Sequence, residues 1–358
     1  MKKFNLKYFL ASNSCEGFVS DFDNCYNPLD NWKAYIIKGG PGTGKSSFMK
    51  YLAAKAEEKN IKTVLCPCSS DPNSLDGVII SDIKTVILDG TAPHTLDPVL
   101  PGVCEEILNF GQFWETEELE TYRNEIISVT KENKNHHKSA SKYFKSAGAL
   151  IYDNLNLSLT FTDKEKVTQF AKKLCKKHIP AKRGNSYEWV RYLGGLTPKG
   201  VVAFGGTALD ECENAVIIDD RFGSVSSILF PKIKEYALNN GYEIITVKNP
   251  FLPSALIDGI IIPELSLAFL REYDYMHLNT DVRRIHARRF INATALSRQK
   301  NHLKLNEKIV KQLLILGCNC LNKAKTVHDE LEKYYISAMD FKKLTAFAED
   351  FANKLFEN

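Results

Sequence analysis

The chain repeats itself, and this repetition limits its fold more than any other feature of the sequence. Segments of the first half return in the same order in the second half, at a spacing of about 180 residues. The matching segments are 8–11 with 191–194, 75–80 with 257–262, and Asn124-Glu125 with Asn306-Glu307. This period is too long for a solenoid repeat, so we predict two tandem domains. A polar segment with a proline, at 179–184, marks the linker and gives domains of residues 1–183 and 184–358.

Each half shows the same order of apolar and helical segments. A short opening hairpin is followed by a strand, a loop, a helix and a second strand, at 63–66 and 243–247. An apolar stretch comes next, and a charged helical region with apolar residues at helical spacing ends each half, at about 115–177 and 303–355. This alternation predicts an α/β fold of two tandem three-layer domains with mainly parallel sheets, each with an appended helical region.

A glycine-rich loop follows the strand of the first half. Residues 39–46 read Gly-Gly-Pro-Gly-Thr-Gly-Lys-Ser and match G-x-x-x-x-G-K-[ST] at every fixed position. The apolar run 34–37 precedes the loop, and Phe48, Leu52 and Ala56 follow it at helical spacing. Glycines let backbone N–H groups point inward at phosphate oxygens, and the helix N-terminus adds partial positive charge. We therefore expect a nucleoside triphosphate to bind here.

The residues of this loop have separate expected roles. Lys45 would reach the β- and γ-phosphates, and the Ser46 hydroxyl would bind Mg²⁺. Asp89 ends the apolar run 86–88, as expected of a carboxylate that supports Mg²⁺ through water. Residue 90 is glycine and not a glutamate that could activate water, so we expect slow hydrolysis. The predicted phosphate-binding residues are Gly39, Gly40, Pro41, Gly42, Thr43, Gly44, Lys45, Ser46 and Ser47.

The second half has lost this motif. Aligned on the flanking strand and helix, residues 219–226 read Asp-Asp-Arg-Phe-Gly-Ser-Val-Ser, so that Val225 stands in place of Lys45. The counterpart of Asp89 is Leu270 or Arg271. Carboxylates repel phosphates, and lost glycines remove backbone freedom, so we expect no triphosphate to bind here in this mode.

Asp219 and Asp220 of the second half leave two interpretations open. Their carboxylates could hold a cation, or they could cap a helix. An inactive copy beside an active one suggests a lid, a regulator or a partner surface for the second domain.

Three polar residues follow the loop in the first half. Asp71 has no carboxylate counterpart in the second half, so it is the candidate for orienting water or a substrate hydroxyl. Asp76 has a copy at Asp258, which suggests a structural turn aspartate. His94 could sense the γ-phosphate, but His277 stands at a similar place, so a structural use is equally supported.

Four arginines gather in the second half, at Arg283, Arg284, Arg288 and Arg289. On a helix, Arg284 and Arg288 would share one face. The cluster could hand an arginine to the γ-phosphate in the first half, bind an acidic partner such as nucleic acid, or be a solvated basic face. Whether any of these arginines acts in cis stays open.

The overall composition indicates a globular protein in a reducing compartment. Hydrophobic residues make up 44% and charged residues 25%, and Lys+Arg exceeds Asp+Glu by only 47 to 43, so charge does not by itself indicate nucleic-acid binding. Nine cysteines, an odd number, favour reduced thiols and a cytoplasmic protein. Cys66-x-Cys68 and Cys318-x-Cys320 could form two halves of a metal site, but C-x-C is not the usual spacing.

The N-terminal segment resembles a short signal peptide, with Met1-Lys2-Lys3 ahead of an apolar part. That part is broken by Asn5 and Lys7, and the segment has a copy in the middle of the chain. We therefore expect it to belong to the fold. No apolar run reaches the length of a membrane span.

The first loop and its setting resemble the P-loop NTPase superfamily, and residues 41–46 look most like the loops of AAA-type ATPases. This resemblance implies ATP or GTP with Mg²⁺, and implies roles for Lys45, Ser46 and Asp89. The AAA-type glutamate after the strand-end aspartate is missing, which argues against a remodelling motor. Residues 68–72 and 88–94, together with the duplication, are similar to a group of bacterial P-loop ATPases sometimes labelled nucleotide kinases.

Three functions follow from these expectations. The first is an ATP-binding P-loop ATPase with slow or partner-stimulated hydrolysis, in which the degenerate second domain regulates or presents a partner. The second is a nucleotide or small-molecule kinase that transfers the γ-phosphate. The third is a nucleotide-gated interaction protein without turnover. The sequence does not name the acceptor, the partner or the oligomeric state.

Overall fold

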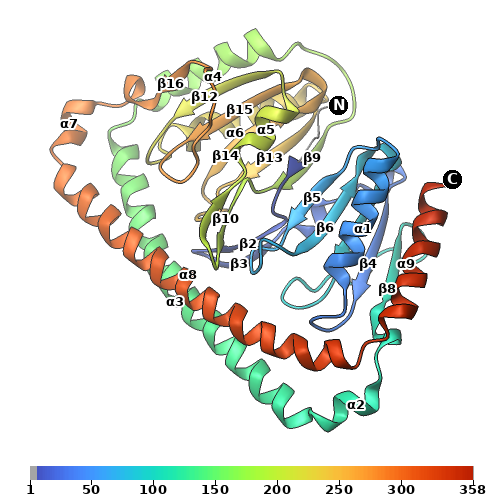
Figure 1. Cartoon of the computed structure of the whole chain (residues 1–358). Coiled ribbons are helices and arrows are strands. Elements are labelled where there is room, and N and C mark those ends of the chain that lie inside the picture. The colour runs from blue at the N-terminus through green and yellow to red at the C-terminus, as the bar shows by residue number, and fades with distance from the viewer. Residues whose placement is uncertain (1–5, 358) are drawn as a thin grey trace. The chain divides into compact units, whose positions relative to one another are not determined.

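A computed structural model of the chain describes residues 6–357. The chain is an α/β protein with two six-stranded sheets, one four-stranded sheet and two helices of 38 residues each (Figure 1). The residues gather in two compact units, each made of separate pieces of the chain. Residues 1–5, the start of the segment that we compared with a signal peptide, lie outside the described residues.

Among the described residues, the first unit contains 6–11, Ser20–Ala140 and 319–357. Its sheet has the strand order β1-β5-β6-β7-β4-β8. Strand β4 is parallel to its neighbours β7 and β8, β1 is parallel to β5, and β6 is antiparallel to both of its neighbours. The strands are β1 (Leu6–Lys7), β4 (Lys33–Lys38), β5 (Val64–Pro67), β6 (Leu75–Ile80), β7 (Thr85–Asp89) and β8 (Glu105–Asn109).

The second unit contains Ser12–Val19 and Ser141–Cys318. Its six-stranded sheet, read from the other end, has the order β9-β13-β14-β15-β12-β16, with the same parallel and antiparallel pairings as the first sheet. The strands are β9 (Tyr187–Arg191), β12 (Asn214–Asp219), β13 (Glu243–Lys248), β14 (Ile257–Ile262), β15 (Leu267–Glu272) and β16 (Arg284–His286).

Two short hairpins, one from each half of the sequence, form the four-stranded sheet, in the order β11-β10-β2-β3. Each hairpin turns at a glycine with positive φ, Gly17 at +113° and Gly200 at +103°, where a side chain would be strained. The strands are β2 (Ala11–Ser14), β3 (Gly17–Ser20), β10 (Gly194–Thr197) and β11 (Gly200–Ala203).

The apolar stretch after the second strand of each half forms two strands and not one. In the first unit β6 and β7 are joined by a single 3-10 turn, and in the second unit β14 and β15 are joined in the same way. Polar residues at 81–82 and Pro263-Glu264 interrupt the apolar run and allow this reversal. Both six-stranded sheets are therefore mixed, with one antiparallel strand inside an otherwise parallel arrangement.

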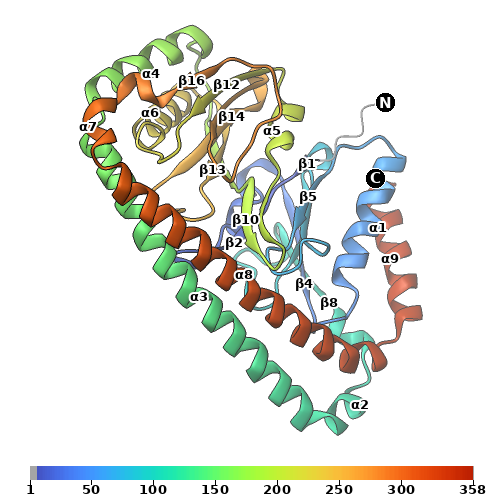
Figure 2. The same cartoon turned by 60° about the vertical axis from the view of Figure 1, so that its left-hand side comes forward.

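Nine α-helices lie in the described residues, and none is long and apolar enough to cross a membrane. The two longest helices, α3 and α8, lie side by side (Figures 1 and 2). In the first unit the Asn133 side chain of α3 donates to the Ala324 carbonyl of α8 at 2.7 Å. In the second unit Asn306 of α8 donates to Asn154 of α3 at 2.9 Å, so the two helices run antiparallel.

The helices have the following bounds: α1 (Lys45–Glu58), α2 (Thr116–Thr121), α3 (Arg123–Thr160), α4 (Lys164–His178), α5 (Gly205–Glu211), α6 (Ser226–Asn239), α7 (Ala293–Ser297), α8 (Lys300–Ser337) and α9 (Phe341–Phe356).

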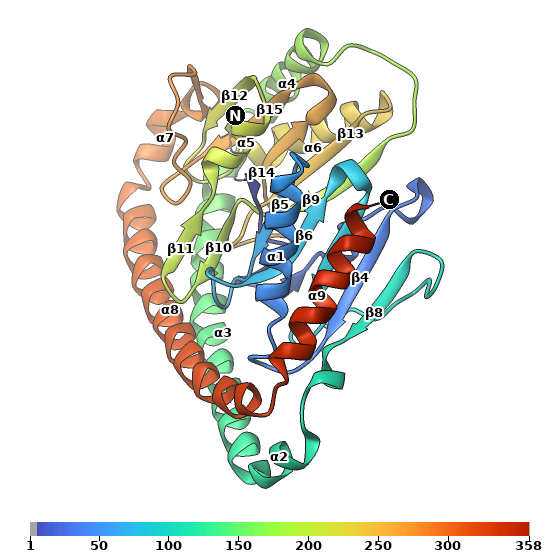
Figure 3. The ribbon, with the colours of Figure 1, turned by 45° about the vertical axis from the view of Figure 1, so that its right-hand side comes forward.

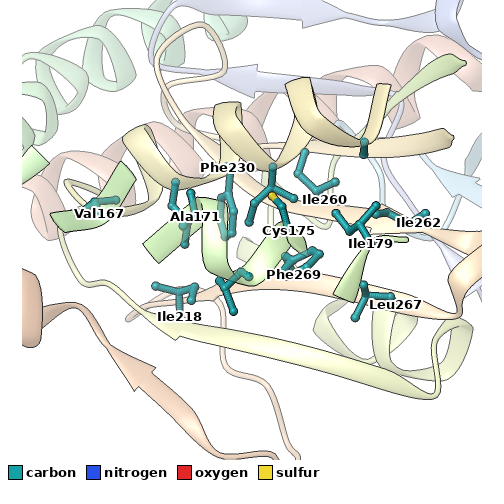
Figure 4. Packing of buried hydrophobic residues seen from close by; sticks show 14 of the residues in the cluster. Val167, Ala171, Cys175, Ile179, Ile218, Phe230, Ile260, Ile262, Leu267 and Phe269 are labelled. Carbon is teal, nitrogen blue, oxygen red and sulfur yellow. The ribbon is translucent and has the colours of Figure 1, made fainter. Parts of the chain in front are cut away.

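The two halves of the sequence exchange their last helices. Helix α9, at the end of the second half, packs beside α1 in the first unit, where Leu344, Ala348 and Ala352 are buried (Figure 3). Helix α4, at the end of the first half, packs on α6 in the second unit through Val167 and Ala171 (Figure 4). The compact units therefore differ from the consecutive division at residues 183 and 184 that we predicted.

Backbone bridges fix both exchanged helices. Trp114, after β8, bridges Met339 just before α9, and Ile291, after β16, bridges Thr162 just before α4. Each helix then begins at an aspartate whose carboxylate accepts backbone N–H groups, Asp340 before α9 and Asp163 before α4. A backbone bridge and an aspartate cap therefore hold the incoming helix in both units.

We predict that Leu344→Ala destabilises the first unit, although residue 344 is about 300 residues from the loop at 39–46 in sequence. The substitution removes apolar contacts from a core of α1 and sheet residues, so the free energy of unfolding should fall by about 2–5 kcal/mol. Denaturant unfolding measures this loss. The control Glu349→Ala, on the exposed face of α9, should change stability by no more than about 0.5 kcal/mol. Equal stability of the two variants would contradict the exchange of helices.

Candidate phosphate-binding site

The candidate site lies at the loop of residues 39–46, here called the first loop, which joins β4 to α1. Gly42 and Gly44 have positive φ angles of +66° and +81°, which side chains other than glycine rarely adopt. Gly44 is the N-cap of α1 and has no side chain to accept the first N–H groups of the helix. The helix N-terminus therefore keeps its partial positive charge available for an anion.

The glycines of the first loop are also required by close packing. A Cβ atom on Gly40 would lie 2.6 Å from the Tyr335 ring, and one on Gly42 would lie 2.9 Å from the Glu332 carbonyl oxygen. A Cβ atom on Gly44 would lie 2.7 Å from Leu344. The end of α8 and the start of α9 thus lie directly against the loop. These neighbours could not be predicted from the sequence, because the exchange of helices leaves no local signal near residue 40.

The carboxylate of Glu332 also reaches the first loop, where it accepts the backbone N–H of Gly42. His328 lies on the preceding turn of α8, with its Nε2 3.5 Å from Glu332 Oε1. The hydrogen bond with His328 lowers the pKa of the Glu332 carboxyl. A negatively charged group thus touches the rim of a loop suited to anions.

Lys45 and Asp89, which we assigned to phosphate and to Mg²⁺, lie close together. Strand β7, which ends at Asp89, is the direct neighbour of β4, so its end lies beside the first loop. Lys45 Nζ is 3.7 Å from Asp89 Oδ2, and both side chains are largely buried, with exposed fractions of 10% and 13%. Lys45 also donates to the Gly40 carbonyl at 2.6 Å, and Asp89 accepts the N–H and the hydroxyl of Thr91.

The other predicted residues of the first loop differ in burial and in hydrogen bonding. Thr43 is buried and donates its hydroxyl to the Gly40 carbonyl at 2.8 Å. The Ser46 hydroxyl accepts the Leu75 N–H at 3.0 Å, and Ser47 is exposed. The positive φ angles, the uncapped helix, the lysine, and the Ser46 and Asp89 oxygens fit a triphosphate with Mg²⁺.

Asp71 holds a turn and an ion pair. Its carboxylate accepts the Asn73 N–H at 3.1 Å and the Ser74 hydroxyl at 3.0 Å. Lys325 of α8 lies 3.6 Å away. These contacts explain the aspartate structurally, and its predicted role toward water or a substrate hydroxyl stays a prediction.

Cys68, Asp76 and His94 form a buried polar cluster beside this site. Asp76 lies in β6 and not in a turn, which corrects our interpretation of it as a turn aspartate. His94 is 5% exposed, whereas His277, which we matched to it, is exposed, so the two histidines have different surroundings. The cluster is therefore specific to the first unit.

Charges within this cluster alter its pKa values. Burial lowers the pKa of His94, but the Asp76 and Asp89 carboxylates outweigh burial, so the pKa lies above its usual value. Burial and the Asp76 carboxylate raise the pKa of the Cys68 thiol. All nine cysteines lie in the described residues, and none forms a disulfide.

In the second loop, residues 219–226, a side chain of the loop itself accepts the backbone N–H groups. Asp220 is 1% exposed, and its carboxylate accepts the N–H groups of Gly223, Val225 and Ser226 at 2.7–3.1 Å. These are N–H groups of a loop entering α6, where a phosphate oxygen would otherwise be bound. Of the two interpretations left open for Asp220, the structure shows the capping one.

Sheet register corrects our alignment of the two loops by one residue. Ile37 pairs with Asp89 in the first unit, and Ile218 pairs with Arg271 in the second. Because α1 begins at Lys45 and α6 at Ser226, the counterpart of Lys45 is Ser226 and not Val225.

The same register makes Arg271 the counterpart of Asp89. Arg271 is buried and donates to Asp258 Oδ1 at 3.0 Å and to the Asp220 carbonyl at 2.8 Å. The strand-end carboxylate of the first unit is thus replaced in the second unit by a guanidinium that stabilises the second loop through a hydrogen bond.

The arginine cluster does not form a helix. Arg284 lies in β16, the edge strand that pairs with β12, and Arg288 and Arg289 lie in the 3-10 turn that follows it. Arg284 is held by Glu272 at 2.8 and 3.1 Å, whereas Arg283 and Arg288 are exposed. Arg289 lies over the Phe170 and Phe290 rings. Transfer of an arginine to the γ-phosphate stays a hypothesis.

No protein-family model, no curated protein and no solved structure matches this chain. The interpretation of the site therefore depends on its own geometry.

We predict that Asp220→Ala destabilises the second unit, because three buried N–H groups lose their acceptor. The free energy of unfolding should fall by at least about 2 kcal/mol. The control Asp219→Ala removes an adjacent carboxylate that is 46% exposed and pairs with His286, so it should cost no more than about 1 kcal/mol. Denaturant unfolding compares the two variants, and equal stabilities would show that the Asp220 bonds are not structural.

Proposed function

We propose that the chain is a P-loop NTPase that binds ATP with Mg²⁺ at the first loop and hydrolyses it slowly or when a partner stimulates it. The observation that carries the proposal is the meeting of Lys45 and Asp89, 3.7 Å apart, at a loop with two positive-φ glycines and an uncapped helix N-terminus. GTP would satisfy the same phosphate contacts. The phosphate chain would lie along the N–H groups of the loop, with Lys45 toward the β- and γ-phosphates.

The first unit supplies the groups that a metal-bound triphosphate needs. The Ser46 hydroxyl and the Asp89 carboxylate would hold Mg²⁺, and bound Mg²⁺ supplies positive charge to the phosphate oxygens. On nucleotide binding, Lys45 would exchange its bond to the Gly40 carbonyl for bonds to phosphate. Both members of the Lys45–Asp89 pair would then keep a charged partner.

The neighbour of Asp89 supports slow turnover. A Cβ atom on Gly90 would lie 2.3 Å from Ile36 Cγ2, so a glutamate cannot stand there without displacing a core side chain. A water-activating carboxylate must therefore come from elsewhere, or hydrolysis must be slow without a partner. We infer that the second unit, whose own loop is closed by Asp220, regulates the first unit or presents a partner surface.

We predict that wild-type protein releases γ-phosphate from Mg²⁺-ATP and that Lys45→Ala reduces the rate by about 100-fold or more. The reason is the loss of the cation that neutralises charge on the transferring group. The measurement is phosphate release and nucleotide binding, with and without a pool of nucleosides and nucleotides. Ser226→Ala is the matched control at the equivalent position of the second unit, where the hydroxyl makes no hydrogen bond within the described residues.

The outcomes separate the three functions. Free phosphate that requires Lys45 supports the ATPase. Transfer only in the presence of the pool would replace it with a kinase, and Lys45-dependent binding without turnover would replace it with a nucleotide switch. Equal binding by wild type and Lys45→Ala would contradict the site itself.

We also predict that Glu332→Gln strengthens ATP binding several-fold. The substitution removes a negative charge that contacts the Gly42 N–H and would repel phosphate, while it keeps the shape of the side chain. Equilibrium titration with a fluorescent ATP analogue measures the change. Glu330→Gln, an exposed position on the same helix, is the charge-matched control and should leave the affinity unaltered. Weaker binding by Glu332→Gln would instead make Glu332 part of the nucleotide site.

A further inference from the structure

We propose that Cys68, Asp76 and His94 form a binding site for one zinc ion in the first unit. The three residues come from three neighbouring segments of the sheet. Cys68 follows the end of β5, Asp76 is the second residue of the antiparallel β6, and His94 follows the end of β7. Because β6 runs opposite to its neighbours, its beginning lies at the same edge as the ends of β5 and β7.

The distances suit a tetrahedral ion. One ligand atom from each residue can be chosen so that all three atoms lie within 4.8 Å of one another, and all three residues have buried or partly buried side chains. Zinc bonds of roughly 2.0–2.3 Å place two tetrahedral ligands about 3.5 Å apart. His94 Nε2 and Asp76 Oδ1 are 3.4 Å apart, which fits two ligands of one ion better than an ordinary hydrogen bond.

The surroundings hold the ligands in place. The Ser70 N–H donates to Cys68 Sγ at 3.3 Å, an interaction that favours a thiolate at this sulfur. The His94 ring stacks on Phe22, with centroids 5.0 Å apart and an interplanar angle of 11°, so the ring is fixed in orientation. A thiolate, an imidazole and a carboxylate together are a donor set that zinc accepts.

The second unit shows how the negative charge of the equivalent aspartate is balanced without a metal. Asp258, the counterpart of Asp76, is buried and accepts bonds from Arg271 at 3.0 Å, from Tyr273 at 2.9 Å and from Asn249 at 2.9 Å. In the first unit, Cys68 replaces Asn249 and Asp89 replaces Arg271. The guanidinium is thus exchanged for another carboxylate, and a buried carboxylate needs a compensating positive charge. A divalent cation held by Cys68 and His94 supplies it.

This inference does not rest on nucleotide binding. Lys45 and Asp89 belong to the neighbouring phosphate site and are not among the proposed zinc ligands. The test therefore includes Lys45→Ala, in which ATP binding should fall while zinc binding persists. Failure of one proposal leaves the other standing.

In the experiment, the chain of residues 1–358 is stripped of metal with a chelator and titrated with Zn²⁺ and separately with Co²⁺. We expect about one equivalent of Zn²⁺ per chain by elemental analysis, and a thiolate-to-cobalt charge-transfer band in the near ultraviolet. Cys68→Ala should remove the band and weaken zinc binding by about 100-fold or more. Cys66→Ala, a buried thiol two residues earlier, should keep both properties.

Two results would overturn the proposal. A wild-type protein that binds Co²⁺ without the thiolate band, or binds no stoichiometric zinc, would show an adventitious ion only. Zinc binding that is unaltered in Cys68→Ala and in His94→Gln would have the same meaning. Because the cobalt spectrum of the wild type is decisive by itself, the proposal remains testable even if a variant fails to fold. In either contrary case a protonated His94 would balance Asp76.

Discussion

The length of the paired helices α3 and α8 is the constraint on which the rest of the structure depends. At 38 residues, each helix is about 57 Å long, roughly twice the diameter of a small domain. A helix of this length cannot bring the next segment back to the sheet from which it started. Each chain half therefore delivers its last helix, α4 or α9, to the unit that contains the other half's sheet. The apolar faces of α4 and α9 are buried there and not against their own half.

The exchanged segments also make different contacts with the two loops. At the second loop, the Ser158 and Thr162 hydroxyls of the incoming segment contact Ser224 at 2.8 and 3.1 Å, and the Asp220 carboxylate takes up the N–H groups. At the first loop, the incoming segment packs Tyr335 and Leu344 against glycines. The incoming segment thus makes hydrogen bonds to the second loop, whereas it packs ring and aliphatic carbons against the first loop, where the N-terminus of α1 has no side-chain cap. Asp220, which stands in place of Gly39, supplies the carboxylate that accepts these N–H groups.

Local patterns in the sequence predicted the parts of the fold that depend on neighbouring residues. The strand, loop and helix around Lys45 and the approach of Asp89 are set by short-range apolar spacing and by the pairing of β4 with β7. The contacts of Tyr335 and Glu332 with the first loop were not predictable, because they join positions almost 300 residues apart through the exchange of helices. The one-residue error in aligning Lys45 with Val225 arose because strand and helix were matched without the sheet register. The arginines at 283–289 have helical spacing, but pairing of β16 at the sheet edge overrode it.

The antiparallel strand β6 gives the first unit its unusual concentration of polar groups. In an all-parallel sheet, the second residue of a strand lies at the edge opposite to the strand ends and away from the first loop. Reversal of β6 moves Asp76 to the edge where Cys68, Asp89 and His94 already lie.

Two carboxylates thereby share one buried region, where each requires a positive partner. Lys45 is within reach of Asp89, at 3.7 Å, and His94 is within reach of Asp76, at 3.4 Å. In the second unit one cation, Arg271, both donates a hydrogen bond to the second loop and neutralises Asp258. Under our two proposals, replacing that arginine by Asp89 separates two tasks: Asp89 would face a phosphate-bound cation, and Asp76 would face a cation of its own.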